Sequence, residues 1–293
     1  MTESQLLEEY LAVVGAGPGN GDKTDAKLLS GQFHDVVLLD EVAYRFPRDE
    51  ESRRLLPARI ALLRVLRSCE MPVAIPGLLS DAAVGKPLGQ CHAALQRVSG
   101  QPIEPDQFAE GSAQSGVITD LTVLFDRLLE LGSNADIQEA VPRADPHSWQ
   151  RFADEVSRVL FRLMSPDGRV RAEAELNRVV AIDPTGDALV HGDLGGTNLL
   201  WTGSGSELRL AAILDWDGAQ IGSQADDLAS IAATFGWPLA EQLDAKRHDG
   251  ATPTLADAKA IAATFALQQA LPAAISGDIP ALDDGLTSYR DAD

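Results

Sequence analysis

The sequence predicts an α+β protein with two lobes, a small mixed α/β lobe at the N-terminus and a larger, mostly helical lobe after it. Strand-like apolar runs are concentrated in the first third of the 293-residue chain, whereas segments with helical periodicity dominate the remainder. A turn-rich segment at residues 99–102, Ser-Gly-Gln-Pro, separates the two parts. We therefore expect residues 1–98 to form the N-lobe and residues 99–293 to form the C-lobe.

The predicted N-lobe elements follow from apolar periodicity and from the positions of proline. In chain order they are a helix at 3–14, a loop at 15–25, strands at 35–39 and 41–46, a helix at 49–68, an extended connection at 72–76 and an edge strand at 93–98. Asp40 between the two strands predicts a tight hairpin, and Pro47 ends the second strand because proline cannot donate to a sheet ladder. Pro57 lies inside the second helix, where we expect a kink or a broken first turn.

The predicted C-lobe is helical apart from one hairpin. Helices are expected at 117–131, 149–164, 169–180, 226–235 and 257–275. Strand-like runs at 198–202 and 207–214 flank a Gly-Ser-Gly-Ser turn, which indicates a hairpin.

Charge and composition limit the classes of partner. The formal net charge is −20, from 44 acidic and 24 basic residues, which argues against nucleic acid and suits a cationic small molecule. No apolar stretch approaches the ~20 residues of a membrane helix, and the acidic N-terminus lacks the basic start of a secretory signal. The two cysteines, Cys69 and Cys91, suggest neither a disulfide framework nor a zinc site. We expect a cytoplasmic protein that does not bind a membrane.

Residues 189–201, Leu-Val-His-Gly-Asp-Leu-Gly-Gly-Thr-Asn-Leu-Leu-Trp, carry the strongest functional signal. An apolar run leads into a loop with His191, Asp193 and Asn198, and a later apolar run ends at Asp215. This is the order of groups used for phosphoryl transfer, in which the first aspartate holds the acceptor hydroxyl and the asparagine and second aspartate hold magnesium. We expect His191 to orient the loop. The alternative interpretation of His191 and Asp193 is a simple hydrogen-bonded turn.

Three further aspartates lie close to this set in the sequence. Asp217 is expected either to approach the same metal as Asp215 or to face the substrate, and Asp226 is a second candidate for the substrate side. Asp227 begins a predicted helix and is expected to support the catalytic loop, with a plain N-terminal helix carboxylate as the alternative. Magnesium needs only one or two protein carboxylates beside the substrate phosphates, so a sparse set is sufficient.

The sequence gives weaker signals for the residues that bind the nucleotide. Gly31 and Gln32 belong to the loop at 30–35, Ser-Gly-Gln-Phe-His-Asp, whose backbone amides are expected to approach phosphates. A simple turn is the alternative, because the chain has neither a Walker sequence nor a full Gly-x-Gly-x-x-Gly loop.

With these residues in place, nearly the whole chain resembles the aminoglycoside phosphotransferase family, relatives of the protein kinases. Residues 191–198 are similar to the catalytic loop of that family, and residues 213–216, Ile-Leu-Asp-Trp, to its metal-binding strand. Residues 222–229, Gly-Ser-Gln-Ala-Asp-Asp-Leu-Ala, resemble its Gly-Asp-Pro-Ala-x-Asp-Leu-Ala motif, with departures at Ser223 and Gln224. The resemblance implies a protein-kinase-like fold, ATP or GTP as phosphate donor, and Mg²⁺.

The resemblance also assigns residues of the N-lobe. The segment at 44–47, Tyr-Arg-Phe-Pro, is similar to the run that ends the nucleotide-lysine strand, so Arg45 takes the place of that lysine. Gln96, Arg97 and Val98 then fall at the hinge whose backbone contacts adenine.

One departure from the family concerns the partner of this basic residue. Arg59 stands where the family has a glutamate on the N-lobe helix, and two arginines cannot form a salt bridge. Three outcomes remain open: a carboxylate from the run Asp49, Glu50 and Glu51 replaces the glutamate, both arginines bind phosphates, or the lobe is rearranged.

Within the family, the segments at 31–34, 191–196, 264–270 and 285–290 resemble the viomycin and capreomycin phosphotransferase branch. The leading hypothesis is transfer of the γ-phosphate of ATP or GTP to a hydroxyl of a cationic antibiotic, a tuberactinomycin-type peptide or an aminoglycoside, which confers resistance. The alternatives are a small-metabolite kinase of the same fold and a non-catalytic kinase-fold protein that binds a small molecule. A monomer and a homodimer are both compatible with the sequence.

Overall fold

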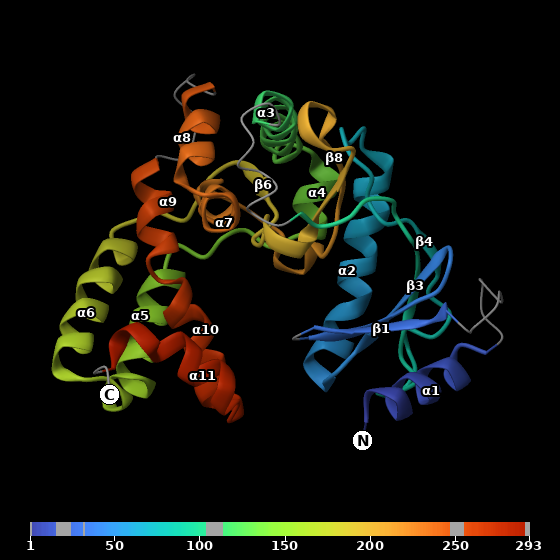
Figure 1. Cartoon of the computed structure of the whole chain (residues 1–293), viewed down its shortest axis with the longest axis horizontal. Coiled ribbons are helices and arrows are strands. Elements are labelled where there is room, and N and C mark those ends of the chain that lie inside the picture. The colour runs from blue at the N-terminus through green and yellow to red at the C-terminus, as the bar shows by residue number, and fades with distance from the viewer. Residues whose placement is uncertain (1, 16–24, 32, 104–113, 247–254, 291–293) are drawn as a thin grey trace.

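A computed structural model describes residues 2–15, 25–31, 33–103, 114–246 and 255–290, and the chain forms two lobes that lie side by side (Figure 1). The N-lobe is built on an antiparallel five-stranded sheet in the order β1-β2-β3-β5-β4. Its strands are β1 (Lys27–Ser30), β2 (His34–Leu38), β3 (Val42–Pro47), β4 (Leu78–Ser80) and β5 (Ala93–Gln96). The predicted hairpin is confirmed, since β2 and β3 pair with Leu38 opposite Ala43.

Two helices cover the N-lobe sheet. Helix α1 (Glu3–Val13) packs Tyr10 onto Phe46, with stacked rings 4.0 Å apart, and the Tyr10 hydroxyl donates to Asp35 Oδ2 at 2.9 Å. Helix α2 (Glu50–Ser68) packs on the other side, where its Leu56 and Ile60 share a core with the alternate residues of β5.

The first turn of α2 is intact rather than broken, because Asp49 accepts a hydrogen bond from the amide of Ser52, and the helix continues through Pro57. One prediction about the sheet is wrong. The segment expected at an edge is β5, which lies between β3 and β4. The outer strand β4 could not be predicted from the sequence, because it has only three residues and no clear alternation of apolar and polar positions.

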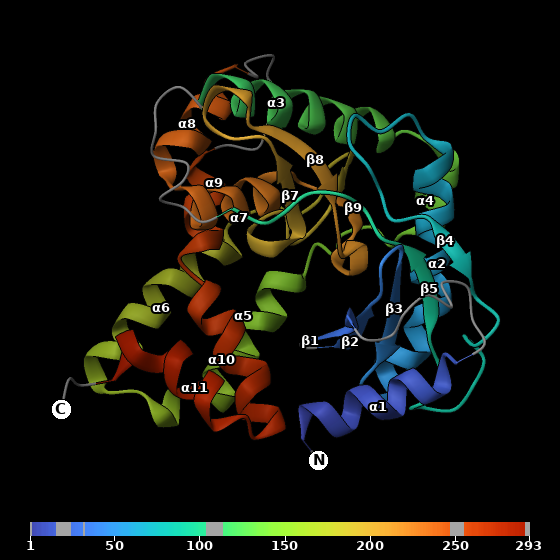
Figure 2. The same ribbon diagram turned by 45° about the vertical axis from the view of Figure 1, so that its right-hand side comes forward.

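The C-lobe is mostly helical (Figure 2). Its helices are α3 (Gln114–Leu131), α4 (Ala135–Ala140), α5 (Ser148–Val159), α6 (Pro166–Val180), α7 (Ala225–Phe235), α8 (Trp237–Lys246), α9 (Leu255–Ala262), α10 (Phe265–Ser276) and α11 (Ile279–Leu286). Its strands are β6 (Ala188–Val190) paired with β9 (Gln220–Gly222), and β7 (Leu199–Thr202) paired with β8 (Arg209–Ile213).

The β7–β8 hairpin confirms the prediction from the Gly-Ser-Gly-Ser turn, but the helix expected at 257–275 is two helices. The chain breaks between α9 and α10 at Thr264, a fully buried residue whose carbonyl accepts from the amide of Gln268. Apolar residues continue through the break at helical spacing, so periodicity alone does not reveal it.

Two segments that precede helix α3 in the sequence border the two edges of the β7–β8 hairpin. Ala74, in the connection after α2, forms a parallel bridge with Ala212 on β8. Gln101, just past the N-lobe sheet, forms an antiparallel bridge with Trp201 on β7. The predicted extended connection at 72–76 is therefore part of the contact between the lobes.

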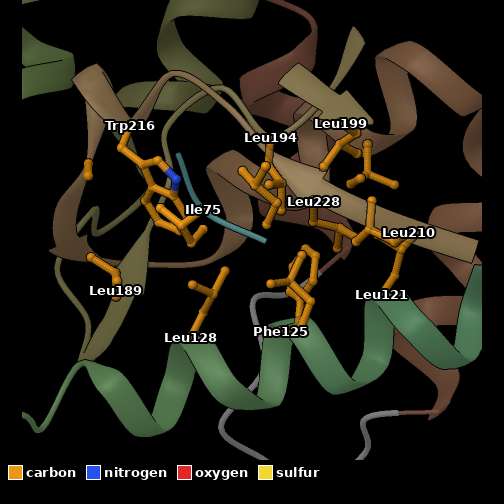
Figure 3. Close-up of a cluster of buried hydrophobic side chains, with 14 of the residues drawn as sticks. Ile75, Leu121, Phe125, Leu128, Leu189, Leu194, Leu199, Leu210, Trp216 and Leu228 are labelled. Atoms are coloured by element: carbon orange, nitrogen blue, oxygen red, sulfur yellow. The ribbon is translucent and has the colours of Figure 1, made fainter. Parts of the chain in front are cut away.

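Helix α3 supplies much of the core beneath the hairpin. Figure 3 shows Leu121, Phe125 and Leu128 on α3 pointing toward Leu194 and Leu199, and all five side chains are fully buried. Because Leu194 follows Asp193 directly, its burial fixes the segment at 191–198 to the apolar core. Among the described residues, no helix combines the length and apolar character needed to cross a membrane.

The end of α3 approaches the chain just before β6 so closely that only glycine fits. A Cβ atom at Gly132 would overlap the backbone carbonyl of Asp187, and backbone cannot move aside as a flexible side chain can. We predict that Gly132→Ala lowers the free energy of unfolding by about 1–3 kcal/mol or more, measured by denaturant unfolding. Gly85→Ala is the matched control, because the space around Gly85 is open. Equal stability of the two variants would contradict this account.

Candidate active site

A buried carboxylate positions the segment that follows β6. Asp227, on the first turn of α7, accepts hydrogen bonds from the backbone amides of His191 and Gly192, each at 2.9 Å. Gly192 has φ of +86° and lies against the backbone of Gly218, where a Cβ would be too close. Burial raises the pKa of Asp227 to about 7, although the two amides favour the ionised form. Asp227 thus lies where a support for the loop was expected.

The imidazole of His191 is fully buried and uses both ring nitrogens. Nε2 lies 2.8 Å from the Leu214 carbonyl, and the backbone amide of Asp193 donates to Nδ1 at 3.2 Å. Nε2 must therefore carry the proton, and burial lowers the pKa of the ring, which keeps it neutral. This geometry ties the loop to the end of β8 and leaves no ring nitrogen for a reacting group.

Asp193 and Asn198 face one another across the loop. The Asn198 amide nitrogen donates to Asp193 Oδ2 at 2.8 Å and to the Asp193 carbonyl at 3.0 Å. Asp193 is exposed, so one carboxylate oxygen is held in place while the group as a whole remains accessible. With its nitrogen used in this way, the Asn198 side chain presents its oxygen as a ligand.

Asp215, at the end of β8, has an unusual backbone conformation. Its φ of 56° makes it the only non-glycine residue with positive φ in the part of the chain that the structure describes. Such left-handed residues are uncommon and recur at functional sites. Its Oδ1 accepts from Arg45 Nη2 at 2.8 Å. Burial would raise the pKa of Asp215, but the Arg45 guanidinium beside it holds this pKa below its usual value.

Arg45 and Arg59 share a carboxylate that the sequence did not indicate. Asp217 Oδ2 accepts from Arg45 Nη2 and lies 3.0 Å from Arg59 Nη1. Among the described residues, no side chain of the run at 49–51 pairs with the two arginines: the Asp49 side chain caps α2, and Glu50 pairs with Arg53. The acid facing the two arginines therefore comes from the C-lobe.

His34 completes this cluster. Its Nδ1 lies 3.1 Å from Arg45 Nη2, and its Nε2 lies 3.4 Å from Arg59 Nη1. Burial, together with the two guanidinium groups, lowers the pKa of His34 to about 3, so the ring is neutral at physiological pH. Sequence reasoning missed this role, because strand alternation places His34 on a face but does not identify what meets it there.

The other residues predicted on the nucleotide side lie in two places. Gly31 is in the turn between β1 and β2, where its amide donates to the His34 carbonyl and its own carbonyl accepts from Arg48. Gln32 lies outside the described residues. The backbone amides of Gln96 and Arg97 donate to the carbonyls of Gly77 and Glu41.

Val98 differs from these two hinge residues, since no hydrogen bond from its amide is found among the described residues.

Asp226 lies beside Asp227 on the first turn of α7 and is partly exposed. Burial raises the pKa of Asp226 to about 6.

The acidic groups around Asp215 fit a magnesium ion. Asp215 is half exposed, with 48% of its side-chain surface accessible, and the Asn198 oxygen is available nearby on the loop that ends at β7. The second oxygen of Asp217, Oδ1, is buried and has no hydrogen-bond partner among the described residues, so the site has acceptor capacity left over. No cluster of three or more acidic, His or Cys ligands occurs among the described residues.

Comparisons with known proteins bear on the meaning of this site. The model of the phosphotransferase enzyme family matches residues 25–262. Viomycin phosphotransferase of Streptomyces vinaceus is 36% identical over 260 residues, which cover 89% of this chain and 91% of that protein.

Solved structures with the same fold have lower sequence identity. The GDP complex of wild-type aminoglycoside 2'-phosphotransferase-IIIa has a TM-score of 0.80 at 19% identity, covering 96% of each chain. The macrolide 2'-phosphotransferase MphH from Brachybacterium faecium, as apoenzyme, has a TM-score of 0.69 at 18% identity, covering 97% of this chain and 98% of that one. The predicted kinase-like fold is confirmed by these structures.

The two hydrogen bonds that Asp227 accepts predict that its substitution lowers the thermal stability of the protein. Asp227→Asn places an amide N–H₂ against one of two backbone N–H groups, which leaves a buried donor unpaired at a cost of about 1–3 kcal/mol. Asp226→Asn is the matched control, because the Asp226 carboxylate accepts no hydrogen bond among the described residues. We expect thermal unfolding to show a lower midpoint for Asp227→Asn alone, and equal midpoints would contradict the anchoring role.

Proposed function

We propose that this chain, which belongs to the phosphotransferase enzyme family, phosphorylates a hydroxyl group of a cationic antibiotic. The observation that carries the proposal is the juxtaposition of Asp193, Asn198 and Asp215, joined by hydrogen bonds through one short loop and the end of β8. Phosphoryl transfer needs positioned groups more than unusual acids, and these three side chains supply the positions.

In this proposal Asp193 accepts the proton of the acceptor hydroxyl and orients its oxygen toward the γ-phosphate. Asn198 holds Asp193 through its amide nitrogen, and its oxygen together with Asp215 would hold Mg²⁺. Bound there, the magnesium ion would neutralise charge on the donor phosphates. His191 transfers no proton in this scheme, because both ring nitrogens are engaged in fixing the loop.

The phosphate donor is a purine nucleoside triphosphate, ATP or GTP, bound between the lobes. A relative with this fold has been solved with GDP, which supports nucleotide binding by the fold. We assign the phosphates to Arg45 and to the turn at Gly31 and Gln32, and the base to the hinge at 96–98. The lobe division at residues 98 and 99 and a cytoplasmic location belong to the same proposal.

The acceptor is inferred from the similarity to viomycin phosphotransferase and from charge. The net charge of −20 favours a cationic molecule, and Asp226 offers a carboxylate next to the loop. A tuberactinomycin-type peptide is the first candidate, an aminoglycoside the second. A small-metabolite kinase remains the alternative for the same site chemistry.

The function is tested by turnover with a panel of peptide, aminoglycoside and macrolide antibiotics, followed by mass spectrometry for the gain of one phosphate. We expect Asp193→Asn and Asp215→Ala to lower kcat by at least about a hundredfold, since positioned proton transfer and metal binding are lost. Folding of each variant is checked by circular dichroism. Equal turnover in wild type and Asp193→Asn would point instead to a binding protein without catalysis.

Acceptor binding should depend on pH through Asp226. Because the pKa of Asp226 is raised to about 6, its carboxyl is ionised at pH 8 and largely protonated at pH 5. The KM for a cationic acceptor should therefore rise as pH falls through about 6. Asp226→Asn should raise KM at pH 8 and remove this dependence. A KM profile unchanged by the substitution would exclude Asp226 from the acceptor site.

A further inference from the structure

Two arginines from different elements of the N-lobe converge on one oxygen atom of the C-lobe. Arg45 comes from β3 and Arg59 from α2, and both reach Asp217 Oδ2. The three side chains are largely shielded from water, with 11%, 15% and 12% of their surfaces exposed. The Asp217 carboxylate, which both arginines share away from water, is therefore the group that balances the positive charges of Arg45 and Arg59.

Each guanidinium group uses only part of its hydrogen-bonding capacity. Among the described residues, Arg45 contacts its acidic partners through Nη2, and Arg59 contacts Asp217 and His34 through Nη1. Arginine has five N–H donors in a planar fork, so several donors of each side chain remain uncommitted. Two neighbouring guanidinium groups with free N–H donors are well suited to bind a phosphate group.

His34 separates the two guanidinium groups without adding charge. Its ring is buried, faces Arg45 on one side and Arg59 on the other, and is neutral. Without Asp217, two positive charges a few ångströms apart would repel one another in a site with little water. The carboxylate thus keeps the arginines side by side.

We propose that Asp217 is the positioning residue of a two-arginine clamp, in which Arg45 and Arg59 bind the donor phosphates together. In protein kinases a helix glutamate positions a single lysine for the same purpose. Here the acid belongs to the other lobe, so the clamp is complete only when the lobes are together. The inference rests on the proposed function, because it takes Arg45 as a phosphate ligand.

The clamp accounts for the two carboxylates beside Arg45. Asp215 would hold the magnesium ion, so Arg45 would then lose one of its two acidic partners and keep Asp217. The second phosphate-binding side chain is Arg59, which extends from α2 to Asp217. This assigns Asp217 to the nucleotide side of the site and leaves Asp226 as the acceptor-side carboxylate.

The test measures nucleotide binding by calorimetry and needs no acceptor. Asp217→Asn should weaken binding of the nucleoside triphosphate by about tenfold or more, since charge-assisted contacts from both arginines are lost. Binding of the free nucleoside should change by less than about twofold, because it has no phosphate to engage the arginines. The triphosphate defect should appear both with magnesium and with EDTA. Asp187→Asn, at an exposed C-lobe carboxylate, is the control and should bind as wild type.

A second variant tests whether Asp217 acts through the arginines. Arg59→Met in the Asp217→Asn background removes an arm that Asp217 no longer positions, so the double variant should bind triphosphate within about twofold of Asp217→Asn alone. If Asp217→Asn fails to fold, Arg59→Met replaces it, and loss of one arm should weaken triphosphate binding by about fivefold.

Four results would overturn the clamp. A defect seen only with magnesium would make Asp217 a metal ligand, and an equal defect for the nucleoside would make it a general structural residue. A double variant that binds triphosphate about fivefold more weakly than Asp217→Asn alone, or an Arg59→Met variant that binds as wild type, would show that Asp217 and Arg59 do not act together. A wild-type protein that binds no nucleotide would instead refute the proposed function itself, and the clamp with it.

Discussion

The buried carboxylate of Asp227 is the contact on which the geometry of the site depends. It accepts hydrogen bonds from the backbone amides of His191 and Gly192 at the point where β6 ends and the loop at 191–198 begins. The hydrogen bond to the His191 amide is buried and so shielded from water, and it sets the direction in which the loop leaves β6. His191 extends the constraint to β8 through the Leu214 carbonyl. A second helix contact, from Thr234 of α7 to the amide of Gly196, holds the far end of the loop.

Charge is arranged differently on the two sides of the site. Around the loop, carboxylates and neutral amides predominate, whereas Arg45 and Arg59 bring positive charge from the N-lobe to meet Asp215 and Asp217. In a protein with net charge −20, the two arginines are a local concentration of positive charge. Under the proposed function, this positive charge would favour the donor phosphates, and the acidic excess elsewhere would favour a cationic acceptor.

Much of the fold could be predicted from the sequence, because the strongest patterns are local. The β2–β3 and β7–β8 hairpins follow from turn residues between apolar runs, and the loop at 191–198 follows from spacing. Contacts between residues far apart in the sequence could not be predicted. Arg45 and Asp217 are 172 residues apart, and no sequence pattern indicates that they meet. The helix break at Thr264 was also missed, because Thr264 is buried and the apolar pattern continues through it. The central place of β5 likewise depends on a short strand without its own signal.

The bridges on either side of the β7–β8 hairpin affect how the gene could recombine. Ala74 and Gln101 both precede the C-lobe helices, yet each pairs with a strand of the hairpin. An exchange of lobes between relatives at residues 98 and 99 would supply both edges of the hairpin from different parents, Ala74 from one and Gln101 from the other. The sequences of these two segments must therefore be inherited together with β7 and β8, which makes the hairpin and its borders a single evolutionary unit that crosses the lobe boundary.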